Sequence, residues 1–513
     1  MEAREVYSYH VFYFPFKWAI PGESHKSFEK QVELSHIPIN TASAWQRVQL
    51  QKNENLAKLT ESELNERKEL FGERQYFFEF IHPMMYDFSD DGKNIIAHYE
   101  RKEPANGNVQ YHIYRPDKEY ILEVEGINLN LYSTGVGILS FYLANTSKDQ
   151  DSEFAVREIN QFGRRIMPPH SNEFATNDRS LIAKRLSISG LKTDNPLRYD
   201  DEFNYVLYRK REDELDMNAT WTPSHLIINL IKDLSDSLNV TPVIDDRMFV
   251  NCWYGNDTLS KEIKENGEEF SKGEFWYQYV FVDNGESISP YTSTCQNDKM
   301  RENLLKDSTN TRWQKFGTLY GVTRYSIVVI TDREFYGKNI ISMHMRTIYS
   351  RMFELAIIQN ASLLRFSEEV VQVSDLKGNN GKDIAERIGS LYKEYIRFMN
   401  QAYFSNVTAQ DQGIELYGMM LKQLNLESQI KELKDEISEL YQYITLIIDQ
   451  KRNKNGEDLN LLAAICLPAT IIAGLFGMNK FAELDDLKCQ VILIISISAI
   501  FLFIANYYLK TRK

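Results

Sequence analysis

The chain has 513 residues and a formal net charge of −13, so it is long enough for two or more folded units. This acidic balance argues against broad nucleic-acid binding, which needs a basic face to neutralise phosphates, and we expect no direct nucleic-acid partner. The four cysteines are scattered without a Cys-x-x-Cys pair. This pattern fits a reducing cytosol and argues against a disulfide framework or a zinc ribbon.

The first 335 residues are predicted to be rich in strands. Short aromatic and β-branched runs, with turn signals between several of them, predict strands at 7–14, 76–81, 111–114, 121–125, 203–208, 249–254, 275–282 and 325–330. Helices are predicted at 61–70 and from Thr222, an N-cap residue that precedes Pro223. We therefore expect residues 1–335 to form an α/β (α+β) cytoplasmic domain, in one or two subdomains, with a sizeable and partly antiparallel sheet.

Helical periodicity begins near residue 336. It predicts two long cytoplasmic helices at 336–407, with a break at 378–381, and a stalk helix at 408–458. Six apolar residues of the stalk follow heptad spacing: Ile430, Leu433, Ile437, Leu440, Ile444 and Ile447. This seam predicts that the stalk helix packs side by side with another helix, either from another copy of the chain or from the chain's own domain.

Two apolar runs, 459–476 and 489–509, close the chain on either side of a loop at 477–488. Each run is long enough to cross a hydrocarbon core of about 30 Å. Basic residues precede the first run and fill the tail 510–513, so the positive-inside bias places both termini in the cytoplasm. With no signal peptide visible at the N-terminus, we expect a multi-pass protein of the inner (plasma) membrane.

The first apolar run has one stepped face of small, polar and leucine side chains. Its members are Leu459, Ala463, Leu467, Thr470 and Gly474. Several copies arranged in a ring would give a narrow tube in which leucine constrictions close by dewetting. The alternatives are that Thr470 and Gly474 are ordinary helix-contact residues, and that the hairpin is a membrane anchor without a pore.

The segment 459–479 ends in Phe476-Gly477-Met478-Asn479 and resembles the CorA family of magnesium channels. The resemblance covers roughly residues 453–513. It implies a homopentameric funnel that passes divalent cations, with Mg²⁺ as the transported or regulatory ion, the first span lining the pore and the cytoplasmic domain gating it. By position it implies an outer mouth at Gly477, Met478 and Asn479, where the Asn479 amide oxygen meets hydrated Mg²⁺.

The same resemblance assigns the remaining pore positions. It implies that Thr470, Gly474 and Ala463 line the pore, that Leu459 and Leu467 form its constriction, and that Asn453 lies near the inner mouth. The acidic loop residues Glu483, Asp485 and Asp486 would raise the cation concentration at the entrance.

Three features depart from the family pattern and bear on ion selectivity. Phe476 stands where a tyrosine is usual, and Lys480 stands where an aromatic residue is usual. The loop keeps an acidic residue at Glu483 but lacks the Met-Pro that usually precedes it. All three weaken the expectation of magnesium selectivity without weakening that of a pore. Met478 favours the magnesium-type branch, because a zinc-transporting branch more often has Gly-Ile-Asn; a zinc-type transporter is the alternative.

The cytoplasmic part is larger than in typical members. It loosely resembles a subset of CorA-like proteins associated with type III CRISPR defence, which implies a membrane effector opened by a nucleotide messenger such as a SAM-AMP-type molecule or a cyclic oligoadenylate. Two basic clusters, Arg164-Arg165 and Arg209 with Arg211, could meet its phosphates, although such clusters are more often solvated surface. No phosphate-binding loop, zinc-ligand pattern or nucleophile elbow occurs, so we expect no enzyme.

Overall fold

In the computed structural model, the chain forms two compact units. The first comprises Met1–Asp375 and Ser390–Glu436, and the second comprises Leu376–Gly389 and Ile437–Lys513. The described residues are 4–20, 34, 37–50, 60–88, 95–101, 108–115, 117–165, 183–191, 200–202, 209–211, 214–215, 223–244, 247–283, 295, 297–374, 381–477, 491, 495–496, 498–499 and 503.

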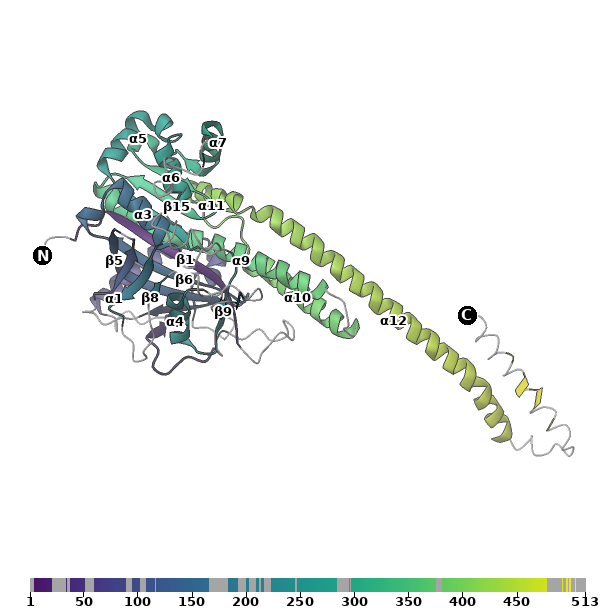
Figure 1. Cartoon of the computed structure of the whole chain (residues 1–513). Coiled ribbons are helices and arrows are strands. Elements are labelled where there is room, and N and C mark those ends of the chain that lie inside the picture. Colours follow the sequence, from purple (N-terminus) through teal and green to yellow (C-terminus); the bar gives the residue numbers. More distant parts are fainter. Residues whose placement is uncertain are drawn as a thin grey trace. The chain divides into compact units, whose positions relative to one another are not determined.

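A large mixed sheet forms the centre of the first unit (Figure 1). Its main path runs β13 (Thr309–Asn310), β14 (Leu319–Val322), β15 (Ser326–Thr331), β12 (Phe249–Gly255), β1 (Ser8–Ala19), β6 (Val136–Asn145), β5 (Glu119–Tyr132), β4 (Gln110–Tyr114), β7 (Arg185–Ser189) and β8 (Asp200–Glu202). Off this path, β11 (Asn239–Pro242) pairs with β1, while β2 (Trp45–Arg47) pairs with β3 (Ile96–Arg101) and β3 pairs with β5. Strands β12 and β15 are parallel, with Val250 opposite Ser326.

Helices cover both faces of this sheet. One face carries α3 (Glu153–Gly163), α4 (His225–Leu234), α5 (Asp257–Phe270), α6 (Glu274–Phe281) and α7 (Asp298–Ser308), whose apolar side chains share a core with the strands. The other face meets α8 (Ser342–Arg346) and α9 (Ile348–Ser374). Strand β1 is therefore an almost uninterrupted apolar run: Phe12 belongs to the first core, while Tyr13 meets Phe353 of α9 edge to face.

Helices also flank the sheet and form the C-terminal part. They are α1 (Glu61–Gln75), α2 (His82–Met85), the π-helix η8 (Tyr336–Ile341), α10 (Gly381–Gln401), α11 (Asp411–Gln423) and α12 (Leu426–Gly477). The strands predicted near 7–14, 111–114, 121–125, 249–254 and 325–330 correspond to β1, β4, β5, β12 and β15. The predicted strand 203–208 lies outside the described residues.

Two predicted strands are wrong. Residues 76–81 contain a short 3-10 helix, Glu79–Ile81, before α2, and residues 275–282 lie almost entirely in α6. Both segments are short apolar runs, in which periodicity alone does not separate a strand from a buried helix. In α6 the side chains of Trp276 and Tyr279 are fully buried, so the helix is apolar around most of its surface.

Two predicted helix boundaries also move. Helix α4 begins at His225 with Ser224 in the N-cap position, later than the predicted start at Thr222. The stalk predicted at 408–458 is divided into α11 and α12, because Asn425 adopts a positive φ of 54° that ends the first helix. Asparagine tolerates this left-handed conformation better than most residues, which makes it a common helix stop.

Helix α12 contains the first apolar run, 459–476, and ends at Gly477. Among the described residues, no helix is both long enough and apolar enough to cross a membrane. The loop after Gly477 and most of the second run, 489–509, lie outside the described residues. The membrane hairpin, its topology and the pentamer therefore stay predictions.

Candidate functional site

The stepped face of α12 carries the predicted pore residues. Leu459 and Leu467 have 69% and 58% of their surface exposed in the single chain, and Asn453 and Ala463 are exposed as well. At Gly474 a Cβ atom would meet no other atom within 4 Å. The helix therefore presents these positions on its surface, as a face that lines a tube between copies would require.

Other predicted pore positions are less completely described. Thr470 lies within α12, but its side chain is outside the described set. The mouth residues Met478 and Asn479, which follow Gly477, lie outside the described residues. So do the acidic loop residues Glu483, Asp485 and Asp486.

The heptad seam on α12 is largely buried within the single chain. Ile430 and Leu433 are buried in the first unit, and Ile437 and Ile444 are buried in the second. In the first unit, burial and the nearby charge of Asp435 raise the pKa of Tyr395, which places α10 close to the start of α12. Of the two interpretations of the seam, packing on the chain's own helices accounts for this burial.

Other apolar side chains of α12 remain exposed. Tyr443 and Leu446, spaced three residues apart on one face of the helix, have exposed fractions of 47% and 62%. The stalk thus has an inner apolar seam and a separate apolar surface.

The first basic pair lies at the amino ends of the parallel strands. Arg164 caps α3, is almost fully buried, and donates through Nη2 to the Val282 carbonyl oxygen at 3.0 Å. Arg165 forms an isolated β-bridge with Arg247. The guanidinium groups of Arg164 and Arg247 lie 6.0 and 4.9 Å from the ring centre of Tyr325.

The second basic pair belongs to another element. Arg209 and Arg211 lie in β9 (Arg209–Arg211), which forms a separate two-stranded sheet with β10 (Glu214–Leu215). Arg247 and Tyr325 were missed by sequence reasoning. Arg247 lies just before the predicted strand 249–254, and Tyr325 is the first residue of the predicted strand 325–330. Only the parallel pairing of β12 with β15 brings the beginnings of these two strands together.

Helix α9 connects the sheet to the C-terminal helices through buried polar contacts. Ser350 bonds the Tyr13 hydroxyl at 2.5 Å, and Glu354 accepts hydrogen bonds from Tyr132, at 3.0 Å, and Asn130. Farther along, Ser362 donates to Thr134 at 3.1 Å. These contacts fix the register of α9 on the sheet, because each buried group left without its partner would cost stability.

The comparison with protein families then identifies the C-terminal part. Residues 359–511 match the family model described as CorA-like Mg2+ transporter protein. This part of the chain is CorA-like. The CorA-like part begins within α9. The first part of this helix therefore precedes the matched region, and the rest of it belongs to that region. No curated protein and no solved structure matches the chain.

Proposed function

We propose that the chain is a CorA-like pentameric channel or transporter for divalent cations, most specifically Mg²⁺, gated by its large cytoplasmic domain. The observation that carries the proposal is the family match at 359–511, which contains both α12 and the Gly477-Met478-Asn479 sequence at its end. The exposed stepped face of α12 supplies the pore wall, with Leu459 and Leu467 as the constriction.

The mouth is suited to a hydrated ion. Mg²⁺ releases its water reluctantly, so a ring of neutral amide oxygens at Asn479 can hydrogen-bond the hydrated ion without removing its shell. The carboxylates of Glu483, Asp485 and Asp486 add a negative potential that gathers cations at this entrance.

Flux through the purified protein tests this function. The full chain is reconstituted into liposomes that contain a Mg²⁺-sensitive dye, and uptake is compared with empty liposomes and with external Zn²⁺ in place of Mg²⁺. We expect Mg²⁺ uptake well above that of empty liposomes. Uptake of Zn²⁺ alone would favour the zinc-type alternative, and no uptake of either ion would contradict a pore.

A second candidate is a ligand-gated defence effector, and the arginine cluster favours it. Arg164 and Arg247 place positive charge beside the Tyr325 ring, and the backbone of Arg165 pairs with that of Arg247. Guanidinium groups bind phosphate oxygens through paired hydrogen bonds. In this version a nucleotide such as a cyclic oligoadenylate or a SAM-AMP-type molecule opens the pore of an inner-membrane protein whose termini are cytoplasmic.

Growth and flux separate the two versions. A housekeeping importer should rescue magnesium-starved cells without any added ligand, whereas an effector should be silent until its nucleotide is present. In liposomes, the effector version predicts that cyclic oligoadenylate or a SAM-AMP-type molecule increases flux and that Arg247→Gln removes this response. Flux that ignores both nucleotides would contradict gating by them.

A further inference from the structure

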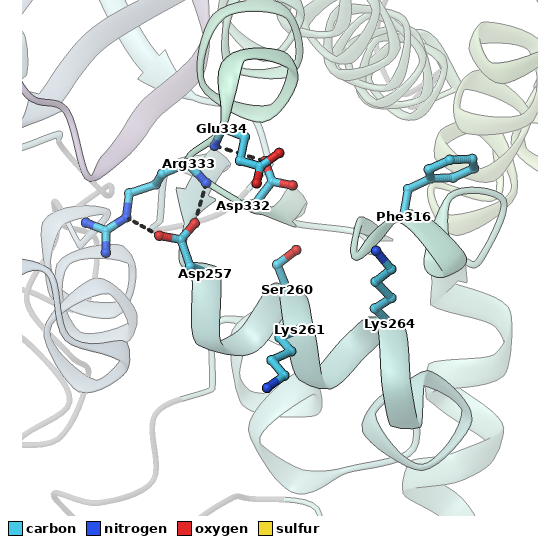
Figure 2. A pocket seen from close by; sticks show the side chains of 8 residues that line it. All are labelled: Asp257, Ser260, Lys261, Lys264, Phe316, Asp332, Arg333 and Glu334. Carbon is cyan, nitrogen blue, oxygen red and sulfur yellow. Dashed lines mark hydrogen bonds and ion pairs between the residues drawn. The ribbon is translucent and has the colours of Figure 1, made fainter.

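A pocket of about 370 Å³ opens where the parallel strands β12 and β15 end (Figure 2). The two strand ends are joined there, since the Asn256 N–H donates to the Thr331 carbonyl oxygen at 2.8 Å. Ligands of α/β proteins recur beyond the carboxyl ends of parallel strands, and this volume is typical of small-molecule sites. The lining residues come from α5, from the turn before β14 and from the segment after β15.

One wall of the pocket is acidic. Asp332 and Glu334 follow β15, and the Glu334 N–H donates to Asp332 Oδ1 at 3.1 Å, which fixes the local turn. Figure 2 shows both carboxylates on the same side of the pocket. Burial raises the pKa of Asp332, although the Lys264 charge opposes this. A cationic group placed between these carboxylates would form charge-assisted hydrogen bonds.

The opposite wall pairs a cation with an aromatic ring. Lys264 of α5 and Phe316 lie across the pocket from the carboxylates, with the Ser260 hydroxyl between the two walls (Figure 2). Phe316 is 69% exposed, and Gly317 turns the chain after it with a φ of 76°. A Cβ atom at position 317 would collide with Ser260, so only glycine lets this turn approach α5 so closely.

The remaining charges of the pocket offset one another. The Arg333 N–H donates to Asp257 Oδ1 at 2.7 Å, and the Arg333 Nε lies 3.7 Å from Asp257 Oδ2. Lys261 also lines the pocket, but its Nζ lies 4.0 Å from Glu265 Oε1 on the same helix, and Figure 2 shows it pointing away from the carboxylates. The charges that face each other across the pocket are then the acidic wall on one side and Lys264 on the other, with an apolar ring beside Lys264.

We propose that this pocket binds a small zwitterionic amino compound of the amino-acid class. Its ammonium group would lie between Asp332 and Glu334, its carboxylate on Lys264, and its apolar side chain on the Phe316 ring. A ligand with a single charge would leave the opposite wall uncompensated, so the arrangement of charges selects for a zwitterion. Binding here goes beyond the proposed function and does not depend on ion conduction.

The pocket is also close to the start of the C-terminal helices. The π-helix η8 begins two residues after Glu334, and its Gly337 packs against Asp332 so tightly that a Cβ atom would collide. Such π-helices recur at functional sites. Asp332 and Glu334 therefore stand directly before the segment that leads through α8 into α9.

Binding to the purified full chain in detergent tests the site. The probe is L-phenylalanine at millimolar concentration, compared with phenethylamine, which lacks the carboxylate, and phenylpropionate, which lacks the ammonium group. We expect L-phenylalanine to raise the unfolding temperature and, by calorimetry, to bind at least about tenfold more tightly than either comparator. No stabilisation by L-phenylalanine, or equal binding of the three compounds, would overturn the proposal.

Two variants then test which group of the ligand each wall of the pocket binds. Lys264→Gln should weaken the binding of L-phenylalanine about tenfold and leave the binding of phenethylamine unchanged. Glu334→Gln should weaken the binding of both amines and leave the binding of phenylpropionate unchanged. Both side chains are exposed, so neither change should lower the unfolding temperature of the ligand-free protein. Lys299→Gln, an exposed lysine of α7 outside the pocket, is the control. Pocket variants that bind like the control would contradict the assignment.

Discussion

His10 is a fully buried, uncharged histidine at the centre of the sheet. Its Nδ1 lies 2.7 Å from Asn160 Oδ1, and its Nε2 lies 2.9 Å from Ser8 Oγ. The Cys252 sulfur is 3.6 Å from the same Nδ1. Burial lowers the pKa of His10 to about 4, because the charged imidazolium would lose its hydration.

This shift predicts a loss of stability in acid. As pH falls from 6.5, the unfolded histidine takes up a proton while the folded one stays neutral until about pH 4. The contribution of His10 to the free energy of unfolding should therefore fall by about 3 kcal/mol across this window and level off below it. Denaturant unfolding of wild type and His10→Gln from pH 7 to pH 4 gives the free energy of unfolding of each at each pH. The wild-type value should fall more steeply with falling pH than the value for His10→Gln. Parallel profiles would contradict a neutral buried His10.

At this scale the sequence identifies candidate residues but does not show which residues lie beside them in the fold. Arg164-Arg165 stands out as a basic pair, but its association with Arg247 and Tyr325 depends on two distant segments meeting at the starts of β12 and β15. The zwitterion pocket is harder still to foresee. Lys264, Phe316 and Glu334 belong to separate segments with no shared motif, and only the fold brings them together.

Helix α9 is the element that joins the two halves of the sequence. Its first half is held on the sheet by Ser350 and Glu354, and its second half lies in the CorA-like region. Near its C-terminal end, Val370 is buried and Val371 is 70% exposed. Substituting these two valines in turn therefore tests whether this end of the helix is packed.

Val370→Ala should lower the free energy of unfolding by about 2 kcal/mol, since it removes buried methyl groups and leaves a cavity. Val371→Ala makes the same chemical change on the exposed side and should stay within about 0.5 kcal/mol of wild type. Thermal and denaturant unfolding of both variants measures the contrast. Equal effects would show that the end of α9 is not packed as described.

Element types follow from the sequence where a segment has a helical or alternating period, or an aromatic and β-branched composition typical of strands. The heptad seam predicts the stalk helix, and alternating or aromatic runs predict β1, β4 and β12. Segments buried on all sides, such as α6, carry no period that distinguishes helix from strand. The division at Asn425 escapes the pattern because apolar spacing continues on both sides of one left-handed residue.

The whole molecule is proposed to work as a pentamer, and the exposed surface of α12 bears on this assembly. Tyr443 and Leu446 are apolar, exposed and separate from the buried seam, so contact with another copy would cover them.

Leu446→Asp should shift the protein from pentamers to smaller species, because it places an unpaired charge in the proposed contact. Thr445→Asp adds the same charge at an exposed neighbouring position on a different side of the helix and should leave the pentamer intact. Native mass spectrometry of both variants in detergent measures the species. An unchanged distribution for Leu446→Asp would place the subunit contact elsewhere.

The central claim is that ions pass a mouth built from Gly477, Met478 and Asn479. The most direct measurement is Mg²⁺ uptake into liposomes by Asn479→Ala, with Asn239→Ala, an exposed asparagine of β11, as the matched control. Loss of the amide ring should lower uptake at least about tenfold, because each subunit loses a hydrogen bond to the hydrated ion. The control should conduct like wild type. Wild-type uptake by Asn479→Ala would contradict the account.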